Sequence, residues 1–241
     1  MAVRGEGPPG EARRLVEEAL REGRGRLLEH EALRLLELYG IPVAGYALAR
    51  SPGEAVEAAR RLGGRVVLKI VSPEIVHKSD VCGVVVGVEP DEAGRVFEEL
   101  VSRVRERAPG ARIVGVLVQR QAPPGAVEVV VGGLRDPVFG PAVMFGLGGV
   151  FVELFRDVSF RVAPFTGEDA EEMMREVRAY KLLKGYRGMP PRDLEALKKI
   201  ILGLERIMMD LPEIREADLN PVMSYPEGAL VVDARFILSK S

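Results

Sequence analysis

Tryptophan is absent from this 241-residue chain, cysteine occurs once and histidine occurs twice. The single cysteine, Cys82, excludes a disulfide within the chain and leaves a cysteine-based metal site short of ligands. This cysteine usage suits a reducing compartment, so we expect a cytoplasmic protein. Aromatic residues make up only 5% of the chain, which disfavours a stacking surface for single-stranded nucleic acid.

A strong excess of charge and a long apolar segment are also missing. The formal net charge is -2, so there is no bulk attraction to nucleic acid or to an anionic membrane. No apolar run reaches membrane length without charged residues. Residues 1–26 are rich in acids and arginines and lack an apolar core, so we expect neither a signal peptide nor a membrane span there. We therefore expect no nucleic acid and no membrane among the partners.

The chain has enough apolar residues for a folded core, with 47% hydrophobic and 29% charged residues. Short strand patterns mixed with helices and hairpins predict an α+β (mixed α/β) fold rather than a purely parallel sheet. We expect an N-terminal extension with a helix over residues 1–26 and two lobes over 27–110 and 111–241. Helices are expected over 11–23, 27–40, 51–64, 90–110, 167–186 and 190–211. Strands are expected over 41–49, 65–71, 81–88 and 112–121, two over 126–149, one over 151–165, and two around a turn over 213–238.

The stretch Val66–Val88, VVLKIVSPEIVHKSDVCGVVVGV, reads as a strand, a polar interruption and a second strand. Lys69 lies inside the first strand, where a buried ammonium group is costly. Two interpretations stay open. Strand alternation could expose Lys69 on the solvent face of an edge strand. Alternatively, its ammonium group is fixed in a cleft and holds a phosphate oxygen.

His77 lies in the polar interruption, and local sequence alone also favours an ordinary loop residue at a bend. Its functional interpretation depends on imidazole chemistry. A large fraction of imidazole is uncharged at neutral pH, so a ring nitrogen can act as a nucleophile and carry a phosphoryl group. Lys78, the next residue, would favour the neutral ring and neutralise the charge of an incoming phosphate.

A third group of polar residues lies in the segment ADLNPVMSYPEGALVVDARF. Asp218 and Asn220 are two residues apart on an extended segment, so their side chains share a face. Asp233 lies on the strand that follows the next turn and could oppose them. Such oxygen ligands suit Mg²⁺ bridged to nucleotide phosphates, although a turn before proline with a surface aspartate is the plainer interpretation.

Glycines form a fourth feature, in the segment FGLGGVFVE. Gly146, Gly148 and Gly149 would let the backbone approach a ligand closely, and their N–H groups could meet a phosphate. A flexible connector explains the same pattern, so this motif is weak when it is taken alone.

Together, three separated motifs resemble those of one family. VVLKIVSPEIVHKSDVCGVVVGV, FGPAVMFGLGGVFVELFRDVSFRVAPF and ADLNPVM are similar to the ATP-grasp β subunit of nucleoside-diphosphate-forming acetate–CoA ligase, over about residues 27–238. The resemblance implies an ATP-grasp fold, in which two α+β lobes enclose a nucleotide cleft. It also implies the reaction acyl-CoA + ADP + phosphate ⇌ acid + CoA + ATP, with His77 as a phosphoryl carrier.

The resemblance further implies a separate CoA-binding α subunit with a phosphorylatable histidine on a mobile loop, in an α2β2 assembly. ATP or ADP would be the nucleotide substrate and Mg²⁺ the metal. A more distant likeness to the β chain of succinyl-CoA synthetase implies roles for further residues. It makes Lys69 a phosphate-binding lysine, Gln119 and Glu128 nucleotide contacts, and Asn220 and Asp233 metal ligands, with Asp218 beside them.

Two departures from the family pattern affect the local geometry. Cys82 stands where a glycine is common, and a positive φ there would strain the turn. Arg120 follows Gln119 where an acid is common in the family, and this departure affects the expected contacts to the base of the nucleotide. Two alternative functions stay open, namely another ATP-grasp acid–thiol or acid–amine ligase, and a non-catalytic nucleotide-sensing subunit.

Overall fold

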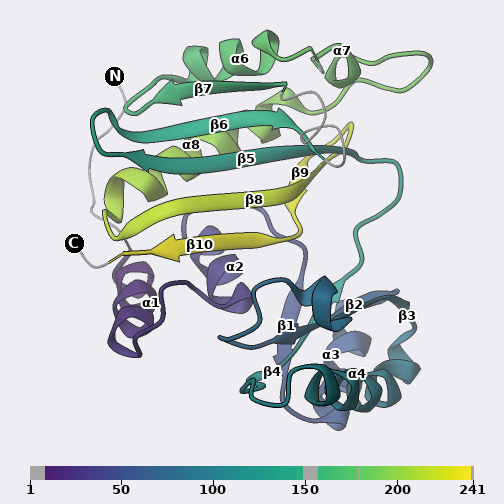
Figure 1. The fold of residues 1–241 in the computed structure, drawn as a ribbon. Helices are drawn as coiled ribbons and strands as arrows, with labels where there is room; N and C mark the ends of the chain where they lie inside the picture. The colour runs from purple at the N-terminus through teal and green to yellow at the C-terminus, as the bar shows by residue number, and fades with distance from the viewer. Residues whose placement is uncertain (1–8, 149–156, 179, 240–241) are drawn as a thin grey trace. The chain divides into compact units, whose positions relative to one another are not determined.

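A computed structural model describes residues 9–148, 157–178 and 180–239 (Figure 1). The chain divides into two compact units. Unit 2 consists of residues Leu28–His30 and Ala44–Pro123, and unit 1 takes the parts of the chain before, between and after these segments. Each unit has its own sheet, and each is described by itself.

Unit 2 contains a four-stranded sheet in the order β1-β4-β2-β3, in which all neighbours are antiparallel. Its strands are β1 (Tyr46–Ala49), β2 (Val66–Val71), β3 (Val84–Val88) and β4 (Gly115–Arg120). Its helices are α3 (Pro52–Leu62), η1 (Lys78–Val81), η2 (Pro90–Glu92) and α4 (Ala93–Arg107). The hydroxyl of Ser51 accepts a hydrogen bond from the Glu54 N–H at 3.2 Å, so Ser51 is the N-cap of α3.

Every residue of β2 is buried, and the strand lies inside the sheet with a neighbour on each edge. Val66, Leu68 and Ile70 belong to one hydrophobic cluster with residues of α3 and α4. The alternate positions, including Lys69, therefore face the other side of the sheet. This strand carries the lysine that the sequence singled out.

Unit 1 contains a larger antiparallel sheet in the order β10-β8-β5-β6-β7, with β9 paired to β8. Helix α8 packs along β5 and β6, and α6 packs beside it against β7 (Figure 1). The strands are β5 (Val127–Asp136), β6 (Gly140–Leu147), β7 (Val158–Val162), β8 (Ile214–Ser224), β9 (Ala229–Val231) and β10 (Ala234–Leu238). The helices are α1 (Gly10–Arg21), α2 (Glu29–Leu38, whose first two residues belong to unit 2), α6 (Gly167–Glu176), α7 (Tyr180–Leu183) and α8 (Leu194–Asp210).

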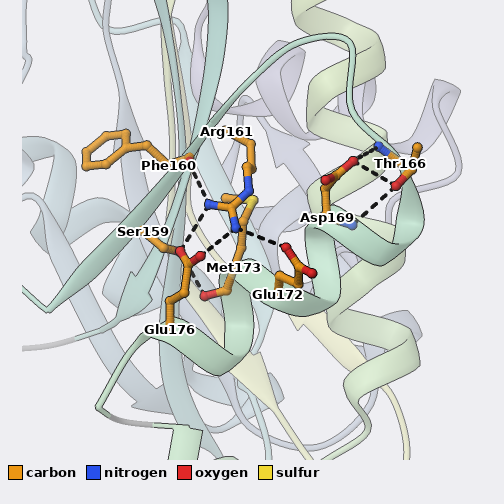
Figure 2. A network of polar contacts seen from close by, with 8 residues as sticks. All are labelled: Ser159, Phe160, Arg161, Thr166, Asp169, Glu172, Met173 and Glu176. Atoms are coloured by element: carbon orange, nitrogen blue, oxygen red, sulfur yellow. Dashed lines mark hydrogen bonds and ion pairs between the residues drawn. The ribbon is translucent and has the colours of Figure 1, made fainter.

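Polar contacts fasten β7 to α6 (Figure 2). The buried Ser159 hydroxyl donates to the Met173 carbonyl at 2.8 Å. Two residues further along β7, the Arg161 guanidinium donates to both carboxylate oxygens of Glu176, at 2.6 and 3.0 Å. The capping box of Thr166 and Asp169 closes the first turn of the same helix. These contacts fix the helix layer against the edge strand of the sheet.

Helix α8 is held at both ends. At its start, the Asp193 carboxylate accepts from the N–H groups of Ala196 and Gly228, each at 2.9 Å. At its end, Arg135 of β5 donates to carbonyls of the last turn and beyond, including that of Leu211. A guanidinium group at the C-terminus of a helix satisfies carbonyls that have no partner within the helix.

The division of the chain differs from the expected one. A boundary was expected near Pro109–Gly110, but β4 follows it and pairs with both β1 and β2. Unit 2 therefore extends to Pro123. The N-terminal helix α1 also clusters with unit 1 instead of standing apart as an extension.

Two expected elements are broken in the structure. The helix expected over residues 167–186 ends at Glu176, and α7 begins only at Tyr180. Val177 has extended backbone angles, and the Arg178 N–H donates to the Asp157 carboxylate at 2.8 Å, which replaces a helical hydrogen bond. The last expected strand is likewise split into β9 and β10, both paired with β8. Among the helices that the structure describes, none is long and apolar enough to cross a membrane.

Candidate functional site

Lys69 lies in the middle of β2, between β3 and β4. The edge-strand interpretation is therefore wrong. Its side chain is only 7% exposed, and its Nζ lies 2.6 Å from Oε1 of Glu29. The lysine is thus a buried ammonium group with a carboxylate partner, as a buried charge requires.

Glu29 is the residue that sequence reasoning missed. Its carboxylate is shared by two lysines, because Oε2 lies 2.8 Å from Nζ of Lys78. Burial by itself would raise the pKa of the Glu29 carboxyl, but the two neighbouring ammonium groups outweigh burial and lower that pKa. The site is therefore a carboxylate that stays ionised between two cations.

No local signal marks Glu29 in the sequence. It is the first residue of α2, and acids are ordinary in the first turn of a helix because of the helix dipole. Its partner Lys69 is 40 positions further along the chain. Only the folded unit brings these residues together.

His77 is exposed and has extended backbone angles at the start of the short helix η1. It helps to line a depression of about 430 Å³, together with Ile75, Asp80 and residues that follow α4. Backbone hydrogen bonds hold its loop, since Asp80 N–H donates to the His77 carbonyl at 3.2 Å and Gly83 N–H to the Lys78 carbonyl at 2.7 Å. The imidazole is thus accessible, on a segment that also supplies Lys78.

Cys82 adopts the left-handed conformation, with φ of 50° and ψ of 38°. The strain expected for a non-glycine residue at this position is therefore present. Gly83 follows it and cannot easily carry a side chain, because a Cβ there would lie 2.6 Å from Cγ2 of Ile70 and 3.1 Å from the Lys78 carbonyl oxygen. The turn after His77 thus depends on close backbone packing.

Gln119 lies in β4, opposite Tyr46 of β1 and Val67 of β2, and is completely buried. Arg120, the departure from the family pattern, is exposed at the end of the same strand. The two neighbouring side chains therefore point to different environments, so the substitution at position 120 does not disturb the burial of Gln119.

In unit 1, Glu128 is exposed at the beginning of β5. The Gly148 N–H donates to the Glu128 carbonyl at 2.8 Å, so this N–H group already has a hydrogen-bond acceptor within the protein. In this conformation the Gly148 N–H therefore does not point to a phosphate, and the role of this glycine stays a prediction. A Cβ on Gly148 would lie 2.9 Å from the Glu128 carbonyl carbon, and one on Gly146 would lie 2.8 Å from Cγ1 of Val158. Close strand packing accounts for both glycines, whereas Gly149 lies outside the described residues.

Asn220 and Asp233 are neighbours, because the Asn220 N–H donates to the Asp233 carbonyl at 3.2 Å. Asn220 is exposed and Asp233 is half-buried. An amide oxygen and a carboxylate are donors that suit Mg²⁺, which keeps several waters and bridges to phosphates. The donor chemistry therefore fits the metal that the sequence predicts.

Asp218 has a different environment. It lies opposite Gly132 of β5 and Arg235 of β10, and its Oδ2 is 3.7 Å from Nη2 of Arg235. Burial raises the pKa of the Asp218 carboxyl, against the opposing effect of Arg235. Among the described residues, no group of three or more His, Cys, Asp or Glu side chains could hold a metal ion. The structure thus joins Asn220 with Asp233 and gives Asp218 a cationic neighbour.

Comparisons with known proteins identify the family of this chain. An ATP-grasp domain family matches residues 18–238. The beta subunit of acetate–CoA ligase [ADP-forming] I from Pyrococcus furiosus is 50% identical over 228 residues, which cover 94% of this chain and 97% of that subunit. The chain belongs to the ATP-grasp family of these beta subunits. The expected family and fold are therefore confirmed.

Two further relatives extend the comparison to other members of the family. Acetate–CoA ligase [ADP-forming] I from Archaeoglobus fulgidus is 48% identical over 95% of this chain, but the match covers 33% of that protein. Acetyl-coenzyme A synthetase 1 from Ca. Korarchaeum cryptofilum, solved with coenzyme A and Ca-AMPCP, superposes with a TM-score of 0.91. It is 55% identical over 95% of this chain and 100% of the solved chain. Another structure of that synthetase contains Mg-AMPPCP, and its phosphohistidine segment points towards the nucleotide-binding site.

Proposed function

We propose that this chain is the nucleotide-binding β subunit of an ADP-forming acyl-CoA synthetase and that His77 carries the phosphoryl group. The overall reaction converts acyl-CoA, ADP and phosphate into free acid, CoA and ATP. The observation that carries the proposal is the exposed imidazole of His77 beside a buried cluster of two lysines and one carboxylate. Its two ammonium groups favour a phosphoryl group next to them.

The transfer step balances with the groups named. In the direction from ATP, a ring nitrogen of His77 contributes its lone pair to a new N–P bond, and its other nitrogen keeps the proton. The bond between the γ-phosphorus and the bridging oxygen breaks, and ADP leaves with that electron pair. Little further covalent chemistry is needed, so positioning and charge neutralisation by Lys69 and Lys78 account for most of the protein's contribution.

Asn220 and Asp233 would hold Mg²⁺, and Asp218 is the weaker candidate because Arg235 is its neighbour. When it is bound, the ion neutralises charge on the nucleotide phosphates. Gln119 and Glu128 are proposed nucleotide contacts, supported by the resemblance to the succinyl-CoA synthetase β chain. Gly146, Gly148 and Gly149 are proposed only as backbone that lies near the nucleotide. The Gly148 N–H is not a proposed phosphate donor, because it donates to the Glu128 carbonyl.

The proposed partner is a CoA-binding α subunit with a phosphorylatable histidine loop, in an α2β2 assembly. This is supported by the beta-subunit name of the Pyrococcus relative and by the Archaeoglobus relative, of which this chain matches one third. The acyl group would be selected by that partner. Because nucleotides and coenzyme A form cytoplasmic pools, we place the reaction in the cytoplasm.

The test uses the complex reconstituted with its α subunit and a radiolabelled phosphate donor. We expect an acid-labile, base-stable label on this chain that is lost in His77→Ala. The chain offers a matched control, because its only other histidine is His30, and His30→Gln should keep the label. A full catalytic cycle in His77→Ala at the wild-type rate would mean that the chain is an ATP-grasp ligase without a phosphohistidine, and it would refute the carrier role.

A further inference from the structure

The carboxylate of Glu74 joins two parts of unit 2 that are distant in sequence. Its Oε2 accepts a hydrogen bond from the Ser72 hydroxyl at 3.0 Å and another from the Arg112 N–H, also at 3.0 Å. The Ser72 hydroxyl in turn accepts from the Glu74 N–H at 3.2 Å. Ser72 directly follows β2, and Arg112 lies 38 positions after Glu74, in the segment between α4 and β4. One carboxylate oxygen therefore ties the beginning of the His77 loop (residues 72–77) to that segment.

The same two segments line the depression beside His77. Residues before and within η1 form one side of it, and residues that follow α4 form the other; the lining residues include Ile75, His77, Asp80, Ala108 and Ala111. Arg112 comes directly after Ala111, so the bond from its N–H to Glu74 connects the two sides. The shape of the depression next to the imidazole therefore depends on this carboxylate.

The backbone around His77 is held on both sides. Before it, Ile75 is buried in the hydrophobic cluster with residues of α3 and α4, and Glu74 is fixed to Arg112. After it, the Asp80 N–H donates to the His77 carbonyl at 3.2 Å. The Glu74 contact is made by an exposed residue, so a substitution there can loosen the loop without opening the core.

We propose that Glu74 is a positioning residue for phosphoryl transfer, which holds the His77 loop to the segment after α4 and so fixes the direction of the imidazole. This inference rests on the proposed role of His77 as the carrier. Transfer needs the attacking nitrogen in line with the leaving oxygen, so a small displacement of the ring slows the step. Glu74 acts through the backbone of the loop and takes no part in the bond-making itself.

The test measures how fast this chain is phosphorylated from labelled Mg-ATP in the reconstituted complex, by rapid quench over a range of nucleotide concentrations. Glu74→Ala removes the accepting oxygen. We expect the maximal labelling rate to fall by at least about tenfold, because misplaced reacting groups slow the transfer. The nucleotide concentration at half-maximal rate should change by less than about threefold, because Glu74 acts on transfer and not on nucleotide binding.

The conservative variant Glu74→Gln separates the hydrogen-bond acceptor from the charge. Its amide oxygen can still accept from Ser72 and Arg112, because both bonds end on one oxygen. We expect its labelling rate to stay within about threefold of wild type. Hydrogen exchange reports on the contact itself, since the Arg112 N–H should exchange faster in Glu74→Ala than in wild type or Glu74→Gln. Wild-type exchange in Glu74→Gln together with labelling as slow as in Glu74→Ala would overturn the proposal, because charge and not position would then decide the rate.

Glu54 offers a matched control in the same unit. Its carboxylate accepts from the Arg50 N–H at 2.8 Å, and its own N–H donates to the hydroxyl of Ser51 at 3.2 Å. Glu54 is exposed, as Glu74 is. Glu54→Ala therefore removes a comparable surface contact at the start of α3 without touching the His77 loop. We expect it to lower the melting temperature about as much as Glu74→Ala does, while the labelling rate stays at the wild-type value.

The outcomes also distinguish this inference from the proposed function. If wild type takes no label, or if His77→Ala keeps it, the carrier role fails and the inference fails with it. If His77 is labelled and Glu74→Ala is labelled at the wild-type rate, only the positioning role is refuted. An equal loss of rate in Glu74→Ala and Glu54→Ala would refute it too, because a general loss of stability would then explain both.

Discussion

The Asn220 N–H donates to the carbonyl of Asp233 at 3.2 Å, so a backbone hydrogen bond joins the residues that carry the two proposed metal ligands. This bond holds the backbone of the exposed Asn220 next to that of the half-buried Asp233. A change in either side chain should therefore affect the metal site and leave the strand pairing intact.

The first prediction concerns this pair. Asn220→Ala or Asp233→Ala should weaken Mg-ADP binding by at least about tenfold, the loss that even outer partners of metal sites cause. Asp218→Asn should weaken it less, because Arg235 is the charged neighbour of Asp218. Titration calorimetry measures the affinities, and circular dichroism checks the fold. Unchanged Mg-ADP affinity in both alanine variants would remove this pair from the site.

The second prediction concerns the pH dependence of the Asp193 cap. Hydrogen bonds from the backbone N–H groups of Ala196 and Gly228 lower the pKa of the Asp193 carboxyl. A carboxyl with a lowered pKa in the folded state stabilises the fold above its unfolded pKa of about 3.9, and this contribution is lost as the pH falls through the folded pKa. Asp193→Ala should cost about 1–2 kcal/mol near pH 7.

Urea unfolding of both proteins at several pH values measures this effect. The difference in the free energy of unfolding between wild type and Asp193→Ala should be full at pH 6–7 and should shrink at acidic pH, below about 4. A difference that stays constant from pH 7 down to the lowest pH at which both proteins fold would argue against the charge as its source.

The third prediction concerns strain at Cys82, with its φ of 50°. A non-glycine residue in this conformation destabilises the folded state by about 1–2 kcal/mol. Glycine removes this strain, but it loses more conformational entropy on folding, which offsets part of the stabilisation. Cys82→Gly should therefore stabilise the protein by about 0.5–1 kcal/mol, or roughly 1–4 °C in melting temperature for a chain of this size. Cys82→Ala is the control, since it removes the thiol and keeps the strain. An equal gain in both variants would assign the effect to the thiol.

The fourth prediction concerns the contact between Gly148 and Glu128. A Cβ at position 148 would lie 2.9–3.0 Å from backbone and side-chain atoms of Glu128. Gly148→Ala should cost about 1–3 kcal/mol through overpacking. Gly53→Ala is the matched control, because a Cβ there meets nothing within 4 Å and the residue lies in a helix. Chemical denaturation compares the two variants, and a neutral Gly148→Ala would show that this end of the strand pair adapts freely.

Local patterns predicted the elements whose determinants are close together in sequence. The helix expected over residues 51–64 is one example, with its N-cap at Ser51. The two strands expected over residues 126–149 are another, and a turn joins them as β5 and β6. In that turn, the Asp136 carboxylate accepts from the N–H groups of Val138 and Phe139, at 2.7 and 2.9 Å. Each signal lies within a few residues of the structure it specifies, so single-sequence reasoning could find it.

The features that escaped prediction depend on distant parts of the chain. Strand alternation cannot show which strand lies inside a sheet, so the interior position of Lys69 was open until the sheet order was known. Its partner Glu29 is 40 positions away. The break between α6 and α7 likewise coincides with a contact to Asp157, 21 positions before Arg178. Periodicity carries no information on such pairs.

The shared carboxylate of Glu29 also bears on which atom of the site becomes phosphorylated. An amine attacks phosphorus only through a free lone pair, and an ammonium group has none. Lys69 and Lys78 are both engaged as ammonium groups with Glu29, so neither competes with the imidazole for the phosphoryl group. A phospholysine would be a dead end for the reaction cycle. In the proposed transfer, the carboxylate that holds the two lysines thereby leaves His77 as the chemically competent acceptor among the three.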